Sequence, residues 1–193
     1  MQRSVVFFWF AGVVLAFTCA GAVAANPYAE LQEREIKALS AQETEDLLKG
    51  RGMGMALPAE LHGYPGPLHV LEVAEQLDLS DEQRQETEEL FETMREQARE
   101  LGQRIVDRER ELDERFAEGG ITSDVIEALT VEIGELQGRL RHLHLSYHLQ
   151  TDELLNEEQK ARYRHARGYH GDADGHSGGG HHGDHHGHGG HHH

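Results

Sequence analysis

Histidine dominates the carboxyl-terminal tail of the chain. Of the 26 residues from 168 to 193, ten are histidine, ten are glycine and three are aspartate. Imidazole is the commonest protein ligand for zinc, copper and nickel, and a glycine-rich backbone is flexible enough to wrap around an ion. The tail therefore predicts transition-metal binding, with zinc expected first and nickel, cobalt or copper as alternatives. The candidate ligands are His170, His176, His181, His182, His185, His186, His188, His191, His192 and His193.

The alternative interpretation of the tail is a purification tag or inert filler. His191 to His193 fit a tag remnant, but the histidine doublets at 181–182 and 185–186 around Asp184 do not resemble vector sequence. Because a segment of this composition cannot build a packed core, we expect residues 169–193 to form a disordered metal-binding tail.

Two further histidines, His144 and His148, are four residues apart and therefore share one face of a helix, as a metal pair requires. The alternative is that both are polar residues flanking an apolar seam beside Tyr147. His142 falls on the other side of the same helix, and His62 falls in a glycine- and proline-rich connector. We expect neither of these two to be a ligand.

No catalytic pair accompanies the candidate ligands. Serines are few, the chain has one cysteine, and no glycine-rich phosphate loop occurs, so the sequence argues against an enzyme. The net charge is −17, with 35 acidic and 18 basic residues. This charge argues against nucleic acid as a partner and favours cations.

The amino terminus has the parts of an export signal. Arg3 gives the positive start, residues 5–17 form an apolar run, and small residues at 22–24 precede a cleavage point near Ala24 or Ala25. Residues 1–25 therefore predict a signal peptide and a periplasmic protein. The alternatives are a retained membrane anchor over residues 4–25 and a lipoprotein at Cys19, whose preceding residues lack the leucine of a lipidation box. Cleavage removes the only cysteine, so stability must come from helix packing, ligand binding or association.

Residues 26–67 divide into a helix-prone stretch and a connector. Residues 30–49 are acidic with scattered leucines, which predicts one short, weakly packed helix. Residues 50–67 contain five glycines and three prolines. They predict an irregular connector with one helical turn at residues 59–62.

The domain over residues 68–168 is strongly helical in pattern. A short helix is expected at residues 68–76. Ser80 and Gln83 then form a capping box that begins a long helix, and Gly119 and Gly120 end it. The apolar stripe of this long helix consists of Leu90, Met94, Ala98, Leu101, Ile105, Leu112 and Phe116.

A second long helix, over residues 123–153, has the clearest periodicity in the chain. Its apolar residues alternate spacings of three and four, which is a heptad seam. Two long helices joined by a short connection must lie antiparallel. The seam consists of Ile126, Leu129, Ile133, Leu136, Leu140, Leu143, Tyr147 and Leu154.

Leu145 and Leu149 fall off this seam and need another partner, either the helix at residues 68–76 or a second copy of the chain. A final cap at Asn156 starts a short helix reaching about Ala166. The predicted fold is therefore all-α, a long antiparallel helical hairpin with short flanking helices. Because a thin hairpin has little core for its length, we expect a homodimer.

The two capped starts form a degenerate repeat, Leu79-Ser80-Asp81-Glu82-Gln83 and Leu155-Asn156-Glu157-Glu158-Gln159, at the two ends of the hairpin. This repeat resembles the paired LTxxQ motif of the Spy/CpxP family of exported bacterial proteins. The run from His144 to Tyr169 also resembles the heavy-metal-resistance and sensor branch of that family, which includes ZraP and the nickel/cobalt sensor CnrX. The resemblance implies a hooked helical hairpin that dimerises into a curved cradle and has no enzymatic activity.

The resemblance also implies a metal site in the folded domain. The nickel/cobalt sensors use two histidines four residues apart before the first long helix, a glutamate in that helix, and a histidine on the last long helix. Here His69 matches the first histidine, whereas Val73 replaces the second and Glu72 is the nearest substitute. The other candidates are Glu89 or Glu92 for the carboxylate and His148 or His144 for the distal histidine.

Two function classes follow. The first is a periplasmic metal-binding protein in heavy-metal resistance or sensing, in which the tail captures the ion and the hairpin positions it or reports its presence. The second is an ATP-independent periplasmic chaperone or envelope-stress modulator, which would hold unfolded exported proteins or act on a membrane-bound stress regulator. Its apolar contact residues would be Leu145, Leu149, Met53 and Met55.

Overall fold

The computed structural model describes residues 28–169, and all the regular structure in that range is helical. This confirms the predicted fold class. No helix in the described range is long and apolar enough to cross a membrane. The predicted signal peptide and the ten tail histidines from His170 onward lie outside the described residues. The elements are α1 (Ala29–Gln32), α2 (Ala41–Lys49), α3 (Leu57–Leu61), α4 (Pro67–Glu72), α5 (Asp81–Glu118), α6 (Ser123–Leu154) and α7 (Glu157–Ala166).

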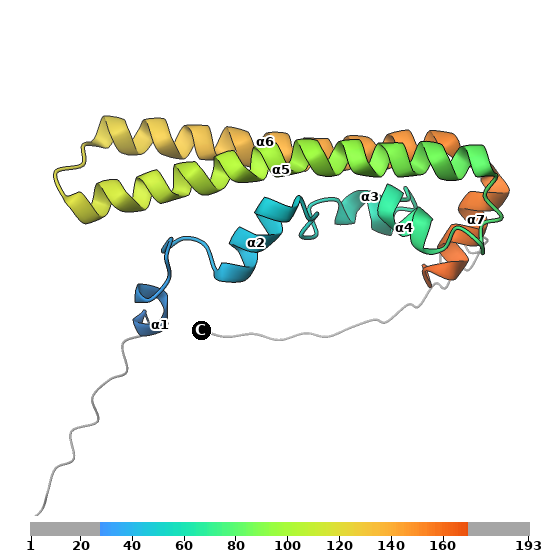
Figure 1. Ribbon diagram of the computed structural model, residues 1–193, viewed down its shortest axis with the longest axis horizontal. Helices are drawn as coiled ribbons and strands as arrows, with labels where there is room; N and C mark the ends of the chain where they lie inside the picture. The colour runs from blue at the N-terminus through green and yellow to red at the C-terminus, as the bar shows by residue number, and fades with distance from the viewer. Residues whose placement is uncertain (1–27, 170–193) are drawn as a thin grey trace, which may run out of the picture.

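Two long helices, α5 and α6, run side by side along the long axis of the molecule (Figure 1). α5 begins at the predicted capping box, in which the Ser80 hydroxyl accepts from the Gln83 backbone and the Gln83 side chain accepts from the Ser80 backbone. It ends after 38 residues at Gly119 and Gly120, whose φ values are 76° and 74°. Glycine enters this region without steric cost. The chain then returns in α6, so the predicted antiparallel hairpin is confirmed.

The predicted seam of α6 forms the centre of the core. Most of its buried residues pack in one cluster with Met94, Ala98 and Ile105 of α5, and with Val106, which the predicted stripe did not include. The expectation for Phe116 was wrong, because its side chain is 56% exposed. None of the other described helices packs beneath the loop end of the hairpin to cover it (Figure 1). The buried seam residues are Leu129, Ile133, Leu136, Leu140, Leu143 and Tyr147.

The segment expected as one helix over residues 30–49 is two helices. α1 is a single turn, and α2 starts at a capping box of its own between Ser40 and Glu43. The expectation of weak packing was also wrong, since Ile36 and Leu47 are buried in the main cluster and α2 lies against α5. At Gly102 of α5, a Cβ would lie 2.1 Å from the Leu47 carbonyl oxygen. Glycine is therefore required where the two backbones meet.

The connector below the hairpin contains two short helices. α3 starts two residues before the helical turn predicted at 59–62, and α4 ends at Glu72 rather than near residue 76. The chain then turns at Asp78, a non-glycine residue with a φ of 53°, and Leu77 beside it is fully buried. Together α2, α3 and α4 form a second layer beneath α5 and α6 (Figure 1).

α7 extends from the end of the hairpin opposite its loop (Figure 1). Asn156 and Gln159 form the predicted second capping box. The two motif glutamines also bond each other: Gln83 Nε2 donates to Gln159 Oε1 and Gln159 Nε2 donates to Gln83 Oε1, both at 2.9 Å. Each repeat therefore caps its own helix and joins it to the other repeat.

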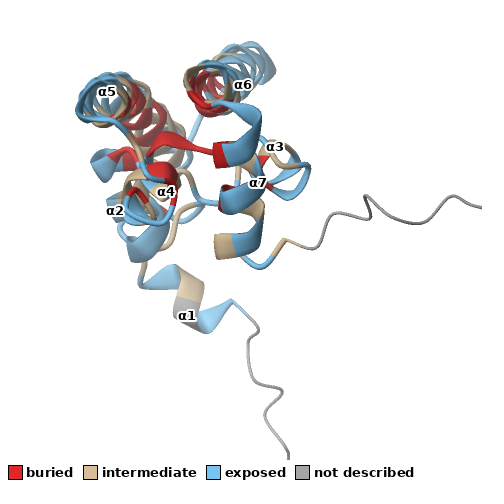
Figure 2. Ribbon diagram, turned by 90° about the vertical axis from the view of Figure 1, so that its right-hand side faces the viewer, coloured by how far each residue is buried: buried red, intermediate tan, exposed pale blue. Residues whose placement is uncertain are grey.

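A second apolar cluster lies at this end of the molecule. Val70, Leu77, Leu155 and Tyr163 are buried together, which holds α7 against α4 and the turn that follows it. The end-on view shows the buried sides of α5 and α6 turned toward each other and toward the helices below them (Figure 2). Within residues 28–169, the hairpin is thus covered on one side only.

Two glycines in the long helices are expected to respond in opposite ways to alanine. Gly102→Ala should lower the free energy of unfolding by about 1–3 kcal/mol, because the added methyl group collides with the backbone of α2. Gly138→Ala should raise it by about 0.5–1 kcal/mol, because nothing lies within 4 Å of its added methyl group and alanine favours a helix. Urea unfolding followed by circular dichroism measures both. Equal effects of the two substitutions would contradict the contact between α2 and α5.

Candidate functional site

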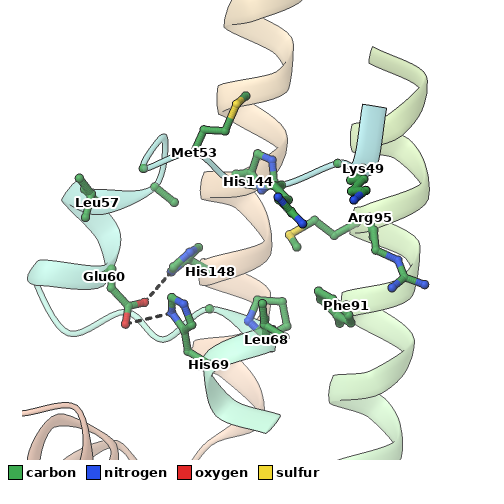
Figure 3. Close-up of a pocket in the computed structure, with 18 residues that line it drawn as sticks. Lys49, Met53, Leu57, Glu60, Leu68, His69, Phe91, Arg95, His144 and His148 are labelled. Carbon is green, nitrogen blue, oxygen red and sulfur yellow. Dashed lines mark ion pairs between the residues drawn. The ribbon is translucent and has the colours of Figure 1, made fainter. Parts of the chain in front are cut away.

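A cavity of about 290 Å³ lies between the connector and the hairpin (Figure 3). The connector around α3 and the start of α4 form one side of it, and α5 and α6 form the other. His69, His144 and His148 all line this cavity. The structure thus brings together the three histidines that the sequence singled out within the folded domain. His62 and His142, which were not expected to be ligands, are exposed elsewhere.

A buried carboxylate, Glu60 of α3, lies at the inner end of the cavity. Its Oε1 atom accepts hydrogen bonds from the hydroxyls of Tyr163 and Tyr169, the latter at 2.8 Å. His69 Nδ1 lies 3.2 Å from Oε1 and His148 Nδ1 lies 3.7 Å from Oε2, as the dashed lines in Figure 3 mark. Glu60 therefore joins α3 to α4, to α6 and to the segment that ends in Tyr169.

The surroundings of Glu60 keep its carboxylate ionised. Burial alone would raise the pKa of Glu60, but the imidazole of His69 and the hydroxyls of Tyr163 and Tyr169 outweigh burial and lower this pKa from 4.5 to about 2. The contact between Glu60 and the tyrosine hydroxyls has the opposite effect on the pKa values of the tyrosines. Burial and the neighbouring carboxylate raise the pKa values of Tyr163 and Tyr169, so both hydroxyls keep their protons and remain donors.

His148 is held by the backbone of the connector. Its Nδ1 lies 2.8 Å from the carbonyl oxygen of Tyr64. Because a carbonyl can only accept, Nδ1 carries the proton in this contact. The other side of the ring lies against Gly66, where a Cβ would be 2.8 Å from Nε2. Glycine at position 66 therefore allows the connector to close over the imidazole.

His144 is buried without a hydrogen bond to its Nε2 atom. Burial and the nearby His148 lower the pKa of His144, so its imidazole is neutral near pH 7. A neutral imidazole has one nitrogen that donates and one that accepts, and it can bind either a metal ion or a polar group of a ligand.

The described residues contain no group of three or more histidine, cysteine, aspartate or glutamate side chains arranged to hold a metal ion. The carboxylates that the family resemblance suggested for a sensor-type site have other partners. These partners are Arg167 for Glu72, Gln85 for Glu89 and Arg95 for Glu92. The cavity histidines present free nitrogen atoms, but the folded domain does not assemble the sensor-type ligand set around them.

Sequence reasoning missed Glu60, the central residue of this site. The only local signal is a glutamate inside a short helix flanked by Ala59 and Leu61, and acidic residues are common throughout this chain. The importance of Glu60 depends on Tyr163 and Tyr169, which are more than 100 residues away and reach it only because α7 folds back. No spacing rule in the sequence links these three residues.

A family model described as "LTXXQ motif family protein" matches residues 68–166 of the chain. The match begins in α4 and ends in α7, so it covers both capping repeats and the whole hairpin. No curated protein and no solved structure gives a significant match.

Replacement of Glu60 by glutamine tests the role of the carboxylate. Glu60→Gln should lower the free energy of unfolding at pH 7 by about 3 kcal/mol, which corresponds to lowering the carboxylate pKa from 4.5 to about 2. Because the folded pKa is depressed, this stabilisation is present in full above pH 4.5 and is lost as the pH falls toward 2. The difference between variant and parent should shrink across that window.

The matched control for this prediction is Glu135→Gln, which removes an exposed carboxylate paired with Arg139 on α6. Exposed pairs contribute little, so its effect should stay within about 0.5 kcal/mol at every pH. Equal urea midpoints for Glu60→Gln and Glu135→Gln at pH 7 would show that the buried carboxylate does not hold this end of the molecule together.

Proposed function

The chain belongs to the LTXXQ motif family, the Spy/CpxP type, since the family model matches just over half of it. On this premise we propose that it is an exported, periplasmic protein that binds transition-metal ions without catalysing a reaction. Its role would be heavy-metal resistance or sensing, as in the ZraP and CnrX branch. Zinc is the ion that the ligand chemistry favours first, with nickel, cobalt and copper as alternatives.

The observation that carries this proposal is the position of Tyr169. This residue precedes the first tail histidine, and its hydroxyl is bonded to Glu60. The tail therefore starts from a fixed point next to the cavity that holds His69, His144 and His148. Ten of the sixteen histidines of the chain follow this point.

The tail, rather than the folded domain, supplies the main ligands in this proposal. Zinc takes four nitrogen or oxygen ligands in a tetrahedron, and a chain rich in glycine and histidine can provide them without a preformed site. The cavity histidines are candidate ligands for a further ion, because His69 Nδ1 and His144 Nε2 make no hydrogen bond. They would bind it more weakly, since the described residues lack a preassembled set of three.

A second candidate function is an ATP-independent chaperone for unfolded periplasmic proteins, or a modulator that acts on a membrane-bound stress regulator. The observation that favours it is a run of exposed apolar side chains along the connector and α3. These are Met53, Leu57, Leu61, Tyr64 and Leu68, each between 39% and 61% exposed. Met55, also considered as a contact residue, is instead half-buried against the main core cluster. Suppression of aggregation by a chain that ends at Tyr169, in the presence of a chelator, separates this function from metal binding.

Removal of the tail tests the proposed metal site. A chain ending at Tyr169 should lose most of the zinc that the full-length protein binds at pH 7.5, while its helical circular dichroism stays the same. At pH 5.5 the full-length protein should lose its zinc as well, because imidazoles with a pKa of about 6.5 are then protonated, whereas carboxylates remain ionised. Calorimetric titration at both pH values measures the stoichiometry.

The control for this titration replaces the exposed histidines outside the tail, His62, His142 and His165, by asparagine in the full-length chain. This variant should keep its zinc stoichiometry. If the truncated chain binds as much zinc as the full-length one, or if binding is equal at pH 7.5 and pH 5.5, the ligands are not the tail histidines.

The proposal includes a homodimer formed through the uncovered side of α6, where Leu149 is 53% exposed and Leu145 is half-buried. Leu149→Glu should shift the protein from dimer toward monomer in sedimentation, because burial of a leucine is worth about 1.5–3 kcal/mol and an unpaired buried carboxylate opposes association. Val125→Glu, at another exposed apolar position of the same helix, should leave the mass unchanged. A monomeric parent protein at tens of micromolar would rule out the dimer.

A further inference from the structure

The cavity between the connector and the hairpin contains polar atoms that none of the described residues satisfies. In the part of the chain that the structure describes, three buried side-chain atoms make no hydrogen bond: Glu60 Oε2, His69 Nδ1 and His144 Nε2. All three belong to residues that line this one cavity. The His69 and Glu60 atoms at least lie within ion-pair distance of a partner group, whereas His144 Nε2 has none. An unsatisfied buried nitrogen is costly and indicates a missing partner.

The walls of the cavity are mostly apolar. Leu57 of α3, Leu68 of α4 and Phe91 of α5 line it (Figure 3). Met94 of α5 lines it as well. The backbone at Gly52 forms part of the wall beside the ring of His144. A cavity with apolar walls and a few convergent polar groups is the usual form of a small-molecule site.

The rim of the cavity carries positive charge, although the chain as a whole has a net charge of −17. Lys49, Arg51 and Arg95 line it, and Glu60 is the only acidic residue that does so. The charge of Glu60 is already balanced by its contacts with His69, His148 and the two tyrosine hydroxyls. Lys49 and Arg95 pair with exposed glutamates of their own helices, and Arg51 pairs with Asp46 of α2. Such pairs contribute little and can be exchanged for a ligand carboxylate.

We infer that this cavity binds a small organic acid, a molecule with an apolar body and one carboxylate. The apolar body lies between α5 and the connector, its carboxylate lies among Lys49, Arg51 and Arg95, and a polar substituent reaches Nε2 of His144. An aromatic or medium-chain acid fits this description. This site goes beyond the proposed metal binding and does not depend on the tail.

The volume of the cavity limits the size of the ligand. At about 30 Å³ per non-hydrogen atom, the share of one molecule in liquid water, a space of 290 Å³ holds about ten such atoms. The rim cations disfavour a bare metal ion, and an uncharged apolar molecule would make no use of them. Benzoate, with nine non-hydrogen atoms, is therefore a suitable probe, and benzamide has the same shape without the charge.

Gly52 offers a way to fill the cavity without disturbing the fold. It does not adopt a left-handed conformation, and a Cβ at this position would lie at an ordinary contact distance, 3.8 Å, from the ring of His144. Gly52→Leu should weaken binding of benzoate at least tenfold, because the new side chain occupies the space of the ligand. Gly138→Leu, at a position where an added Cβ meets nothing within 4 Å, is the control and should bind as the parent does.

The charge requirement is tested by Arg51→Gln combined with Arg95→Gln. This double variant should bind the carboxylate several-fold more weakly and should leave binding of the carboxamide unchanged. Arg139→Gln combined with Arg162→Gln, which also removes two exposed, ion-paired arginines, should have no effect on either probe.

Binding is measured by calorimetry on the full-length chain with a chelator present, and circular dichroism checks that each variant is folded. The inference is supported if the parent prefers the carboxylate and both tests weaken binding as stated. It is overturned if neither probe binds, if Gly52→Leu binds as the parent does, or if the carboxamide binds as tightly as the carboxylate. The last two results would point to nonspecific contact with the exposed apolar side chains.

Discussion

A buried carboxylate needs hydrogen-bond donors, and the donors of Glu60 hold several segments together at one end of this molecule. A charge of this kind is expensive to remove from water unless hydrogen bonds and opposite charges replace the lost solvent. Here the replacements come from segments far apart in the chain: His69 in α4, His148 in α6, Tyr163 in α7 and Tyr169 after it. The position of the connector under the hairpin and the position of Tyr169, which precedes the tail, therefore both depend on the side chain of Glu60.

Gln83 and Gln159 also join segments that are far apart in the chain, and they do so through uncharged side chains. Gln83 and Gln159 each cap a helix, and they bond each other across the junction between α5 and α7. This contact gives both capping repeats of the chain a structural role. A single repeat would cap one helix, whereas two repeats fix the angle at which α7 leaves the hairpin and thus bring Tyr163 to Glu60.

Local patterns in the sequence were sufficient to predict the hairpin but not the site. The heptad seam of α6 and the boundaries set by Ser80, Gly119 and Asn156 depend on neighbouring residues, and they are confirmed. The break between α1 and α2 was missed because the capping box at Ser40 lies among residues that all favour helix. The role of Glu60 could not be predicted, because it depends on contacts between residues that only the folded chain brings together.

The tail and the cavity suit two different classes of ligand. The tail offers many imidazoles on a glycine-rich chain, which suits an ion that selects its own ligand geometry. The cavity offers apolar walls, rim cations and two imidazole nitrogens without a hydrogen bond, which suits an organic anion.

The central claim is that the tail, and not the folded domain, captures the metal ion. The most direct test is nuclear magnetic resonance of the histidine ring nitrogens in the full-length protein during a zinc titration at pH 7.5. The account predicts that the first equivalent of zinc shifts the resonances of the tail imidazoles and leaves those of His69, His144 and His148 unchanged. A first equivalent that shifts these three instead would contradict it and would assign the metal to the cavity.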